Sequence, residues 1–484
     1  MNKILVLNNK KCQFTTDDEK LFKLLYSYLS FKMPGVEYTP AYQNGWNGFT
    51  YLLSKTGKFN YGLLKKVQNF LENKNEKYTI EDKRPATIKN IELDISKNLK
   101  DNKLIPREHQ ERIVVAALST DRGIIRAATG SGKTLCTALI TAKINKPTII
   151  YVIGLDLLDQ FHKLFTKLFN EPIGYIGDGT CNIERINIAS IWTIGRSLKL
   201  DNILEDDNDN KEAEISDKNS DKIIKLLQNT KLHIFDESHV VATNTISEIY
   251  KNIDPEYIYG FSGTPFRDDN SDLLINGILG EQIINVSASE LIKLNLLATP
   301  LIKFFTVPKM SVGTVYTAVY KEYIVENEIR NNLIVFKTKE LIEKKYTPLV
   351  LFKQIKHGEI LLEKLMLAGI RCAMLSGDDS LDKRNEIKDL LLKKEIDLIL
   401  ASTIFDIGLD LPELNALVLC SGGKSSIRAL QRIGRVIRAF PGKKFAAVVD
   451  FYDQVKFLKK HSLTRYAIYS AEDGFKVFKS KEMK

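Results

Sequence analysis

A glycine-rich loop that ends in lysine and threonine is the part of the sequence best suited to chemistry. Its residues are Ala127, Ala128, Thr129, Gly130, Ser131, Gly132, Lys133 and Thr134. It follows a strand-like run at 123–126 and precedes an apolar, helix-like stretch at 135–140. Backbone N–H groups at the start of a helix bind phosphate oxygens, and the glycines let the backbone approach them closely. We expect the loop to bind a nucleotide, with Lys133 at the β- and γ-phosphates and Thr134 on Mg²⁺.

Two adjacent carboxylates follow the apolar run at 232–235, in the tetrapeptide DESH that ends at His239. Hydrolysis of a nucleotide requires one group that holds the metal and another that activates water. We expect Asp236 to hold Mg²⁺ and Glu237 to orient and deprotonate the attacking water. By itself such a pair is more often surface charge or the start of a helix. The phosphate loop in the same region favours the catalytic interpretation.

A second set of polar and charged residues occupies positions 431–438, with the sequence QRIGRVIR. Arg435 and Arg438 are three residues apart, so one face of a helix can present both guanidinium groups to a γ-phosphate as arginine fingers. Gln431 opens the motif. The alternative is a basic amphipathic helix on the surface.

The elements that must position these residues are short β-branched runs that alternate with amphipathic stretches. The clearest runs are residues 148–152, 232–235, 348–352, 398–400 and 446–449. This pattern is typical of buried parallel strands joined by helices. Because the series restarts after about residue 300, the sequence predicts an α/β fold with two parallel-sheet domains in tandem.

Residues 1–100 differ, and predict a small α+β domain. They contain two helical stretches, at 17–29 and 61–72, and between them the turn-forming sequence NGWNG at 44–48. Residues 83–101 have the composition of a polar linker. Trp46 in the turn is a candidate for stacking on a nucleic acid or separating its strands, although a lone tryptophan in a small domain is more often a core residue.

The composition limits the class of partner and the compartment. A net charge of +10 favours a polyanionic partner, although residues 205–221 carry eight acidic side chains against two lysines and predict a solvated loop. The five cysteines lack the CxxC spacing of a zinc site. No stretch is long and apolar enough to span a bilayer. We expect a soluble cytoplasmic protein, acting in the host cytoplasm if it is encoded by a phage.

Taken in order, these segments resemble the motif series of superfamily 2 helicases from about Ile105 to Asp450. Within that resemblance, Arg107 and Gln110 belong to an adenine-sensing element ahead of the phosphate loop. Residues 262–265 (SGTP) resemble the motif that couples hydrolysis to domain movement. Its Ser262 and Thr264, together with His239 of the DESH tetrapeptide, are the candidate coupling residues.

The resemblance also supplies candidate nucleic-acid contacts. Residues 401–412 are similar to motif V, where Thr403 would face the nucleic-acid backbone while Gly408 and Asp410 would lie at the nucleotide. Thr193 follows an apolar run where the first domain of these enzymes grips the backbone, although an ordinary loop between strand and helix is the alternative.

The DESH sequence, the glutamine-first motif and the N-terminal NGWNG turn resemble the UvsW-type phage recombination helicases, a group related to the XPB and RecG branch. The resemblance implies a small N-terminal DNA-recognition domain at 1–100 and RecA-like domains at 101–298 and 299–484. It implies ATP and Mg²⁺ as cofactors, and unwinding or remodelling of branched DNA. Expected partners are single-stranded and branched DNA, with recombination or single-strand-binding proteins as further candidates, and the chain is expected to be a monomer.

Two other functions remain open at this point. The same motor could act on RNA, or the chain could be a nucleic-acid-binding switch or the motor subunit of a restriction-type complex. The complete set of catalytic motifs argues against a passive binder. Only 46 residues follow Arg438, which we expect to be too few for an intrinsic nuclease domain.

Overall fold

A computed structural model describes most of the 484-residue chain. The described residues are 1–32, 36–86, 90–198, 217–237, 244–263, 272–377, 379–402, 411, 413–423, 426–438, 440 and 442–483. Their contacts divide the chain into two compact units, one of Met1–Ala127 with Gly132–Asn285 and the other of Ala128–Ser131 with Val286–Lys484. Among the described residues, no helix is long and apolar enough to cross a membrane.

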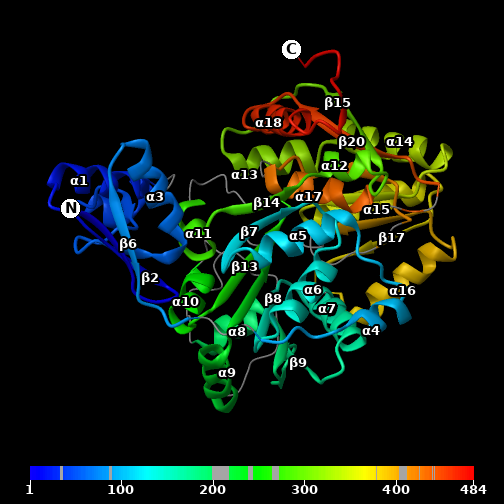
Figure 1. The fold of residues 1–484 in the computed structure, drawn as a ribbon. Helices are drawn as coiled ribbons and strands as arrows, with labels where there is room; N and C mark the ends of the chain where they lie inside the picture. Colours follow the sequence, from blue (N-terminus) through cyan, green and yellow to red (C-terminus); the bar gives the residue numbers. More distant parts are fainter. Residues whose placement is uncertain are drawn as a thin grey trace. The chain divides into compact units, whose positions relative to one another are not determined.

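The N-terminal part of the first unit is a small α+β module (Figure 1, blue). Its four-stranded sheet has the order β5-β2-β1-β6, and β3 and β4 form a separate hairpin. The strands are β1 Asn2–Val6, β2 Lys11–Thr15, β3 Ser30–Lys32, β4 Phe49–Tyr51, β5 Lys58–Asn60 and β6 Tyr78–Asp82. The helices are α1 Glu19–Tyr28, α2 Pro40–Gln43 and α3 Leu64–Asn73, with 3₁₀ turns η1 Val36–Tyr38 and η2 Tyr61–Leu63. The predicted helices at 17–29 and 61–72 are confirmed.

Local chemistry explains where these elements start. Asp18 caps α1, because its carboxylate accepts hydrogen bonds from the backbone N–H groups of Lys20 and Leu21. Residues alternate between buried and half-buried along β1, so one face of the sheet packs against α1 and α3. The result is a core of the module's own, which includes Ile4, Phe14, Leu25, Phe59 and Val67.

The rest of the first unit is built on an eight-stranded sheet with the order β10-β9-β11-β8-β12-β13-β7-β14. Its strands are β7 Arg122–Ala127, β8 Thr148–Val152, β9 Ile173–Gly177, β10 Thr180–Asn182, β11 Ile186–Ser190, β12 Leu232–Asp236, β13 Tyr257–Ser262 and β14 Gln282–Val286. Its helices are α4 Ser96–Asp101, α5 Glu108–Leu118, α6 Lys133–Ile144, α7 Leu155–Leu168, α8 Ile191–Ser197, α9 Asp217–Asn229, α10 Asn244–Asn252 and α11 Asp272–Leu279. The pairs linking β9, β11, β8, β12, β13 and β7 are all parallel.

The second unit is built on a seven-stranded parallel sheet with the order β17-β18-β16-β19-β20-β15-β21. Its strands are β15 Thr299–Val307, β16 Pro348–Phe352, β17 Cys372–Leu375, β18 Leu398–Ser402, β19 Ala416–Leu419, β20 Phe445–Asp453 and β21 Lys476–Phe478. Its helices are α12 Ala288–Lys293, α13 Tyr316–Val319, α14 Glu328–Glu343, α15 Ile355–Leu367, α16 Leu381–Leu392, α17 Ser426–Val436 and α18 Leu458–Ser470, with the π-helix η4 at Tyr320–Val325. The predicted fold class, two parallel-sheet α/β domains with a small N-terminal α+β domain, is confirmed.

The polar stretch at 83–101 is more ordered than a linker. Its last residues form α4, and the side chains of Ile95 and Leu99 are 7% and 8% exposed. The amide of Asn98 donates to the backbone oxygen of Leu168 at 2.8 Å, which ties α4 to the end of α7. The prediction of a linker was therefore wrong for residues 95–101. The two apolar side chains in this polar stretch are buried, and they hold the segment against the parallel-sheet domain.

The N-terminal module contacts the start of β7 through one aromatic ring. The Tyr61 ring lies against the guanidinium groups of Arg84 and Arg122, whose central carbons are 4.5 and 4.2 Å from the ring centroid. Burial and the nearby charge of Asp121 raise the pKa of Tyr61 to about 12, so its hydroxyl stays protonated and donates to Asp121 at 2.9 Å. Arg122 also donates to the backbone oxygen of Asn9.

Next to the Tyr61 ring, the backbone of Gly62 in the N-terminal module approaches the backbone of α11 closely. A Cβ added to Gly62 would lie 2.2 Å from the carbonyl oxygen of Asn276 in α11, so only glycine fits there without a shift of the backbone. Together with the Tyr61 contacts, this close packing fixes the module to the parallel-sheet domain of the same unit.

We predict that Tyr61→Leu destabilises the first unit by about 2 kcal/mol, because it removes two cation–π contacts and a hydrogen bond to a carboxylate. Urea unfolding and the rate of proteolysis near residues 83–95 would measure the effect. Tyr61→Phe is the matched control, since it keeps the ring and loses only the hydroxyl, and should cost about half as much. Equal stability of Tyr61→Leu and the unsubstituted chain would contradict the prediction.

Candidate active site

The strand order of the first sheet brings three of the predicted motifs to one edge. β12, β13 and β7 are neighbours in parallel pairing, with Asp236 opposite Phe261 and Ser262 opposite Arg126. The carboxyl ends of parallel strands meet at the same edge of a sheet, where ligands of such folds bind. The phosphate loop, the carboxylate pair and Ser262 therefore follow adjacent strands.

The phosphate loop has the backbone that its glycines predicted. Gly130 and Gly132 adopt φ angles of +86° and +81°, which residues with side chains rarely adopt. α6 begins at Lys133, directly after Gly132. A Cβ on Gly132 would also lie 2.2 Å from the side-chain nitrogen of Gln110, so a glycine is required at this position for two separate reasons.

Gln110 is held in this place by α5. Its side-chain oxygen accepts a hydrogen bond from the backbone N–H of Arg107 at 3.0 Å, and the residue is only 4% exposed. The side chain of Arg107 is exposed. The predicted adenine-sensing element thus lies against the phosphate loop, through Gln110.

Lys133 and the carboxylates form the charged centre of the site. The Lys133 ammonium lies 3.2 Å from Oε1 of Glu237, and the two side chains are 14% and 20% exposed. The Ser262 hydroxyl donates to the other oxygen, Oε2, at 3.4 Å. Glu237 has a left-handed backbone with φ of 56°, and its neighbour Asp236 is 7% exposed at the end of β12. An anion that enters this site would compete with Glu237 for Lys133.

Several predicted site residues lie outside the described part of the chain. These are His239, Thr264, Thr403, Gly408, Asp410 and the side chain of Gln431. Two other predicted nucleic-acid contacts are described. Thr193 is 2% exposed inside α8, so its side chain is inaccessible in this conformation, whereas Trp46 is 36% exposed rather than a core residue.

In the second unit, the two predicted arginine fingers belong to the end of α17. The helix ends at Val436, so Arg435 lies in its last turn and Arg438 lies beyond it. Arg438 forms a β-bridge with Leu297, and the backbone N–H of Ala298 donates to Ile437 at 2.8 Å. The expectation of one continuous helical face is therefore corrected: a backbone pairing, not the helix, fixes Arg438.

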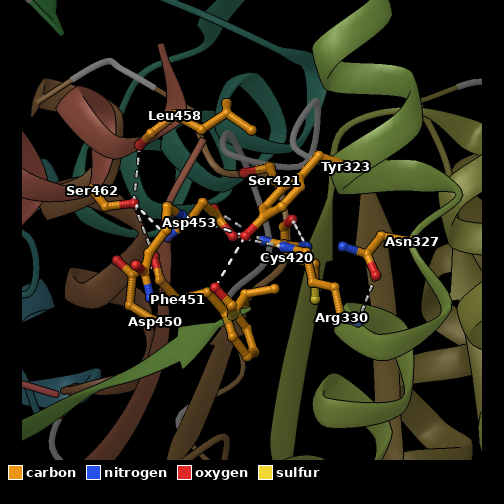
Figure 2. A network of polar contacts seen from close by, with 12 residues as sticks. Tyr323, Asn327, Arg330, Cys420, Ser421, Asp450, Phe451, Asp453, Leu458 and Ser462 are labelled. Atoms are coloured by element: carbon orange, nitrogen blue, oxygen red, sulfur yellow. Dashed lines mark hydrogen bonds and ion pairs between the residues drawn. The ribbon is translucent and has the colours of Figure 1, made fainter. Parts of the chain in front are cut away.

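Two buried Arg–Asp pairs lie in the second unit, and no motif in the sequence marks them. Arg330 pairs with Asp453 at 3.0 Å and Arg465 pairs with Asp450 at 2.8 Å, with all four side chains at most 5% exposed. Figure 2 shows Arg330 between Asp453 and the residues that follow β19. A charge so deeply buried is tolerated only when it is fully paired.

Both arginines also hold the segment that leads from β19 to α17. Arg330 donates to the carbonyl oxygen of Cys420 at 2.9 Å, and Arg465 donates to that of Gly423 at 2.8 Å. Between them, Ser421 accepts a bond from Arg432 on its hydroxyl and one from Tyr320 on its carbonyl. Residues 420–423, which we call the clamped segment, are thus fixed at both ends. The only hint in the sequence was the pair of aspartates at the end of an apolar strand, at 450 and 453.

Comparison with known proteins gives three matches to families along the chain. Residues 5–81 match the N-terminal domain of the DNA helicase UvsW, residues 63–267 the res subunit of type III restriction enzymes, and residues 317–440 the helicase conserved C-terminal domain. The UvsW match covers the N-terminal module, and the other two cover most of the two parallel-sheet domains.

Individual relatives agree with these matches. The chain is 25% identical to putative helicase 22 of Sulfolobus islandicus filamentous virus over 70% of its own length, and spans 62% of that protein. It is 24% identical to the ATP-dependent DNA helicase uvsW of Enterobacteria phage T4, over 94% of each chain. Among solved structures, Dbp5 of S. cerevisiae has a TM-score of 0.54 at 14% identity, covering 80% of this chain and 93% of Dbp5, which shows a shared fold.

We predict that Asp453→Asn lowers the free energy of unfolding of the second unit by about 3 kcal/mol, because it leaves the guanidinium of Arg330 buried without a counter-charge. Denaturant unfolding would measure the change. Glu326→Gln is the matched control: it removes one carboxylate from the solvent-exposed pair with Lys356 in the same unit, and should change stability little. The prediction fails if the two substitutions have the same effect.

Proposed function

We propose, since the chain belongs to the superfamily 2 helicases, that it is an ATP-dependent DNA helicase or translocase that remodels branched DNA. The observation that carries the chemistry is the contact of Lys133 with Glu237 beside the phosphate loop. This contact joins the two motifs that a nucleotide hydrolase requires, at the carboxyl edge of adjacent parallel strands.

Nucleotide binding would rearrange this contact. Phosphate oxygens of ATP would take the place of the Glu237 carboxylate at Lys133, with the loop residues Thr129, Gly130, Ser131 and Gly132 donating backbone N–H groups. The carboxylate of Glu237 would then be released to orient water and accept its proton. In this way the enzyme would keep its base paired with lysine until the substrate arrives.

The metal of such enzymes is proposed to be Mg²⁺. The hydroxyl of Thr134 and the carboxylate of Asp236 are hard oxygen ligands, and Mg²⁺ in nucleotide sites commonly takes one or two protein ligands together with phosphate oxygens. When bound, the ion would neutralise charge on the β- and γ-phosphates. Gln110, with Arg107 beside it, would contact the adenine.

Coupling to movement is proposed to run through Ser262. Its hydroxyl donates a hydrogen bond to Glu237. A change in the position of the Glu237 carboxylate would therefore be felt at Ser262, the last residue of β13. Thr264 and His239 would take part in the same step. Arg435 and Arg438 are proposed as the arginine fingers that would stabilise negative charge on the γ-phosphate.

DNA is proposed as the substrate because the T4 relative, similar over almost the whole chain, carries the description of a DNA helicase. The match of residues 5–81 to the UvsW N-terminal domain supports the same substrate class. Thr403 remains a proposed contact of the motor with nucleic acid, and Asp410 a proposed contact with the nucleotide. Thr193 is not kept as a contact, because its side chain is buried in α8. RNA as the track is the second candidate, and an assay of substrates side by side distinguishes the two.

We predict that Glu237→Gln lowers ATP turnover at least about 100-fold while ATP and DNA binding change little, because a general base is removed but its volume is kept. Turnover by a phosphate-release assay and binding by equilibrium titration would separate the two effects. Lys133→Ala should lose both ATP binding and turnover. Asp254→Asn, an exposed carboxylate of the same unit, is the control and should behave like the unsubstituted enzyme. Normal turnover in Glu237→Gln would remove the assignment of the base.

We also predict that four-way junctions and forks stimulate ATP turnover more than single-stranded DNA, linear duplex or RNA of equal length. Steady-state turnover with each polymer at the same salt concentration would test this, since phosphate contacts make every affinity depend on salt. Stronger stimulation by RNA than by any DNA would overturn the proposed substrate.

A further inference from the structure

The N-terminal module has an aromatic surface that its own core does not use. Trp46, Phe49 and Tyr51 are 36%, 39% and 36% exposed. None of the three belongs to the module's hydrophobic core, whereas Tyr26 of α1 is partly buried and packs against that core. We call the surface formed by Tyr26, Trp46, Phe49 and Tyr51 the aromatic face. Large exposed apolar clusters on a soluble protein usually mark a binding site.

The hairpin β3–β4 explains why these side chains share one side. Lys32 lies opposite Phe49 and Ser30 opposite Tyr51, so these four residues point to the same face of the hairpin. Phe31, one position along β3, points the other way and is 8% exposed. The aromatic side of the hairpin is therefore the outer one.

The rings are held in place although they are exposed. Tyr51 stacks on Tyr26 at a centroid distance of 4.4 Å, and Phe49 lies 6.2 Å from Tyr51. The indole N–H of Trp46 donates to the backbone oxygen of Phe49 at 3.1 Å, and the amide of Asn47 donates to the Tyr51 hydroxyl at 2.9 Å. Because the rings are already ordered, a ligand that stacks on them loses less conformational entropy.

The stretch of chain that carries the face has a net positive charge. Residues 19–60 contain five lysines, all exposed, against two glutamates. Lys32 is on the face itself, where its ammonium also lies 5.0 Å from the centre of the Tyr42 ring. Aromatic rings beside a lysine suit a ligand that has flat bases and a phosphate backbone. A purely apolar protein partner would not need the lysine.

We propose that the aromatic face binds single-stranded DNA, with bases stacked on Trp46, Phe49 and Tyr51 and phosphates near Lys32. The proposal rests on the proposed function, in which the motor exposes single strands. Base stacking and phosphate contacts do not read the edges of the bases, so we expect binding to be independent of sequence.

The test uses the full-length chain without nucleotide and a fluorescein-labelled oligo(dT) of about 15 nucleotides, a length that matches known stacking sites. In the double substitution Phe49→Leu with Tyr51→Leu, we expect the Kd for this strand to rise at least about tenfold, because stacking on each aromatic ring is lost. Intrinsic fluorescence gives a second readout: Trp46 is exposed and Trp192 is 8% exposed, so oligo(dT) should quench the emission of Trp46 selectively.

Two further variants separate stacking from loss of folding. Tyr51→Phe keeps the ring and should bind oligo(dT) as the unsubstituted chain does. Tyr28→Leu removes an equally exposed ring of the module that packs on Phe70 outside the face, and should leave binding unchanged. If Tyr28→Leu weakens binding as much as the double substitution, the aromatic face is not the site.

Unchanged affinity in the double substitution, with unfolding temperature preserved, would overturn the proposal and leave a protein partner as the occupant of the face. This outcome differs from failure of the proposed function, which would appear as absence of DNA-stimulated ATP turnover in the unsubstituted chain. Basal turnover without DNA should be the same in the double substitution, because the face lies outside the nucleotide site.

Discussion

Parallel pairing of three neighbouring strands is the constraint on which the rest of the site depends. β12, β13 and β7 run in the same direction, so the phosphate loop, the carboxylate pair and Ser262 leave the sheet at one edge although about 130 residues separate the first from the last. An antiparallel neighbour would have sent one of these loops to the opposite edge. Once the strand order is set, only short-range chemistry remains to be arranged, such as the close approach of Gln110 to Gly132.

The structure uses ion pairs for two different purposes. Arg330 with Asp453 and Arg465 with Asp450 are almost completely buried and bind backbone carbonyls as well, so breaking them would leave a charge without water. The pair of Lys133 with Glu237 is partly exposed, so either charged group can leave its partner and bind a ligand or water instead. Burial thus separates pairs that are permanent from a pair that can exchange partners.

The sequence predicted most of what depends on local pattern. The apolar runs at 148–152 and 348–352 are strands with the same bounds in the structure, and the glycines at 130 and 132 have the left-handed backbone of a phosphate loop. What it missed depends on tertiary contacts. The role of Arg330 requires an aspartate 123 residues away, and the place of Arg438 is fixed by pairing with Leu297. Thr193 is predicted from its place in the chain to contact the nucleic-acid backbone, yet α8 begins immediately after β11 and buries its side chain.

The contact of Tyr61 with Arg122 has a consequence for how force passes through the first unit. Arg122 is the first residue of β7, and the phosphate loop follows the last, about 20 Å away along an extended strand. A force that acts on the N-terminal module is therefore transmitted to the first residue of β7, the strand that the phosphate loop follows. A shortened chain that begins after the module would leave Arg122 without Tyr61 and without the Asn9 carbonyl. Such a truncation would alter the motor itself as well as remove the module.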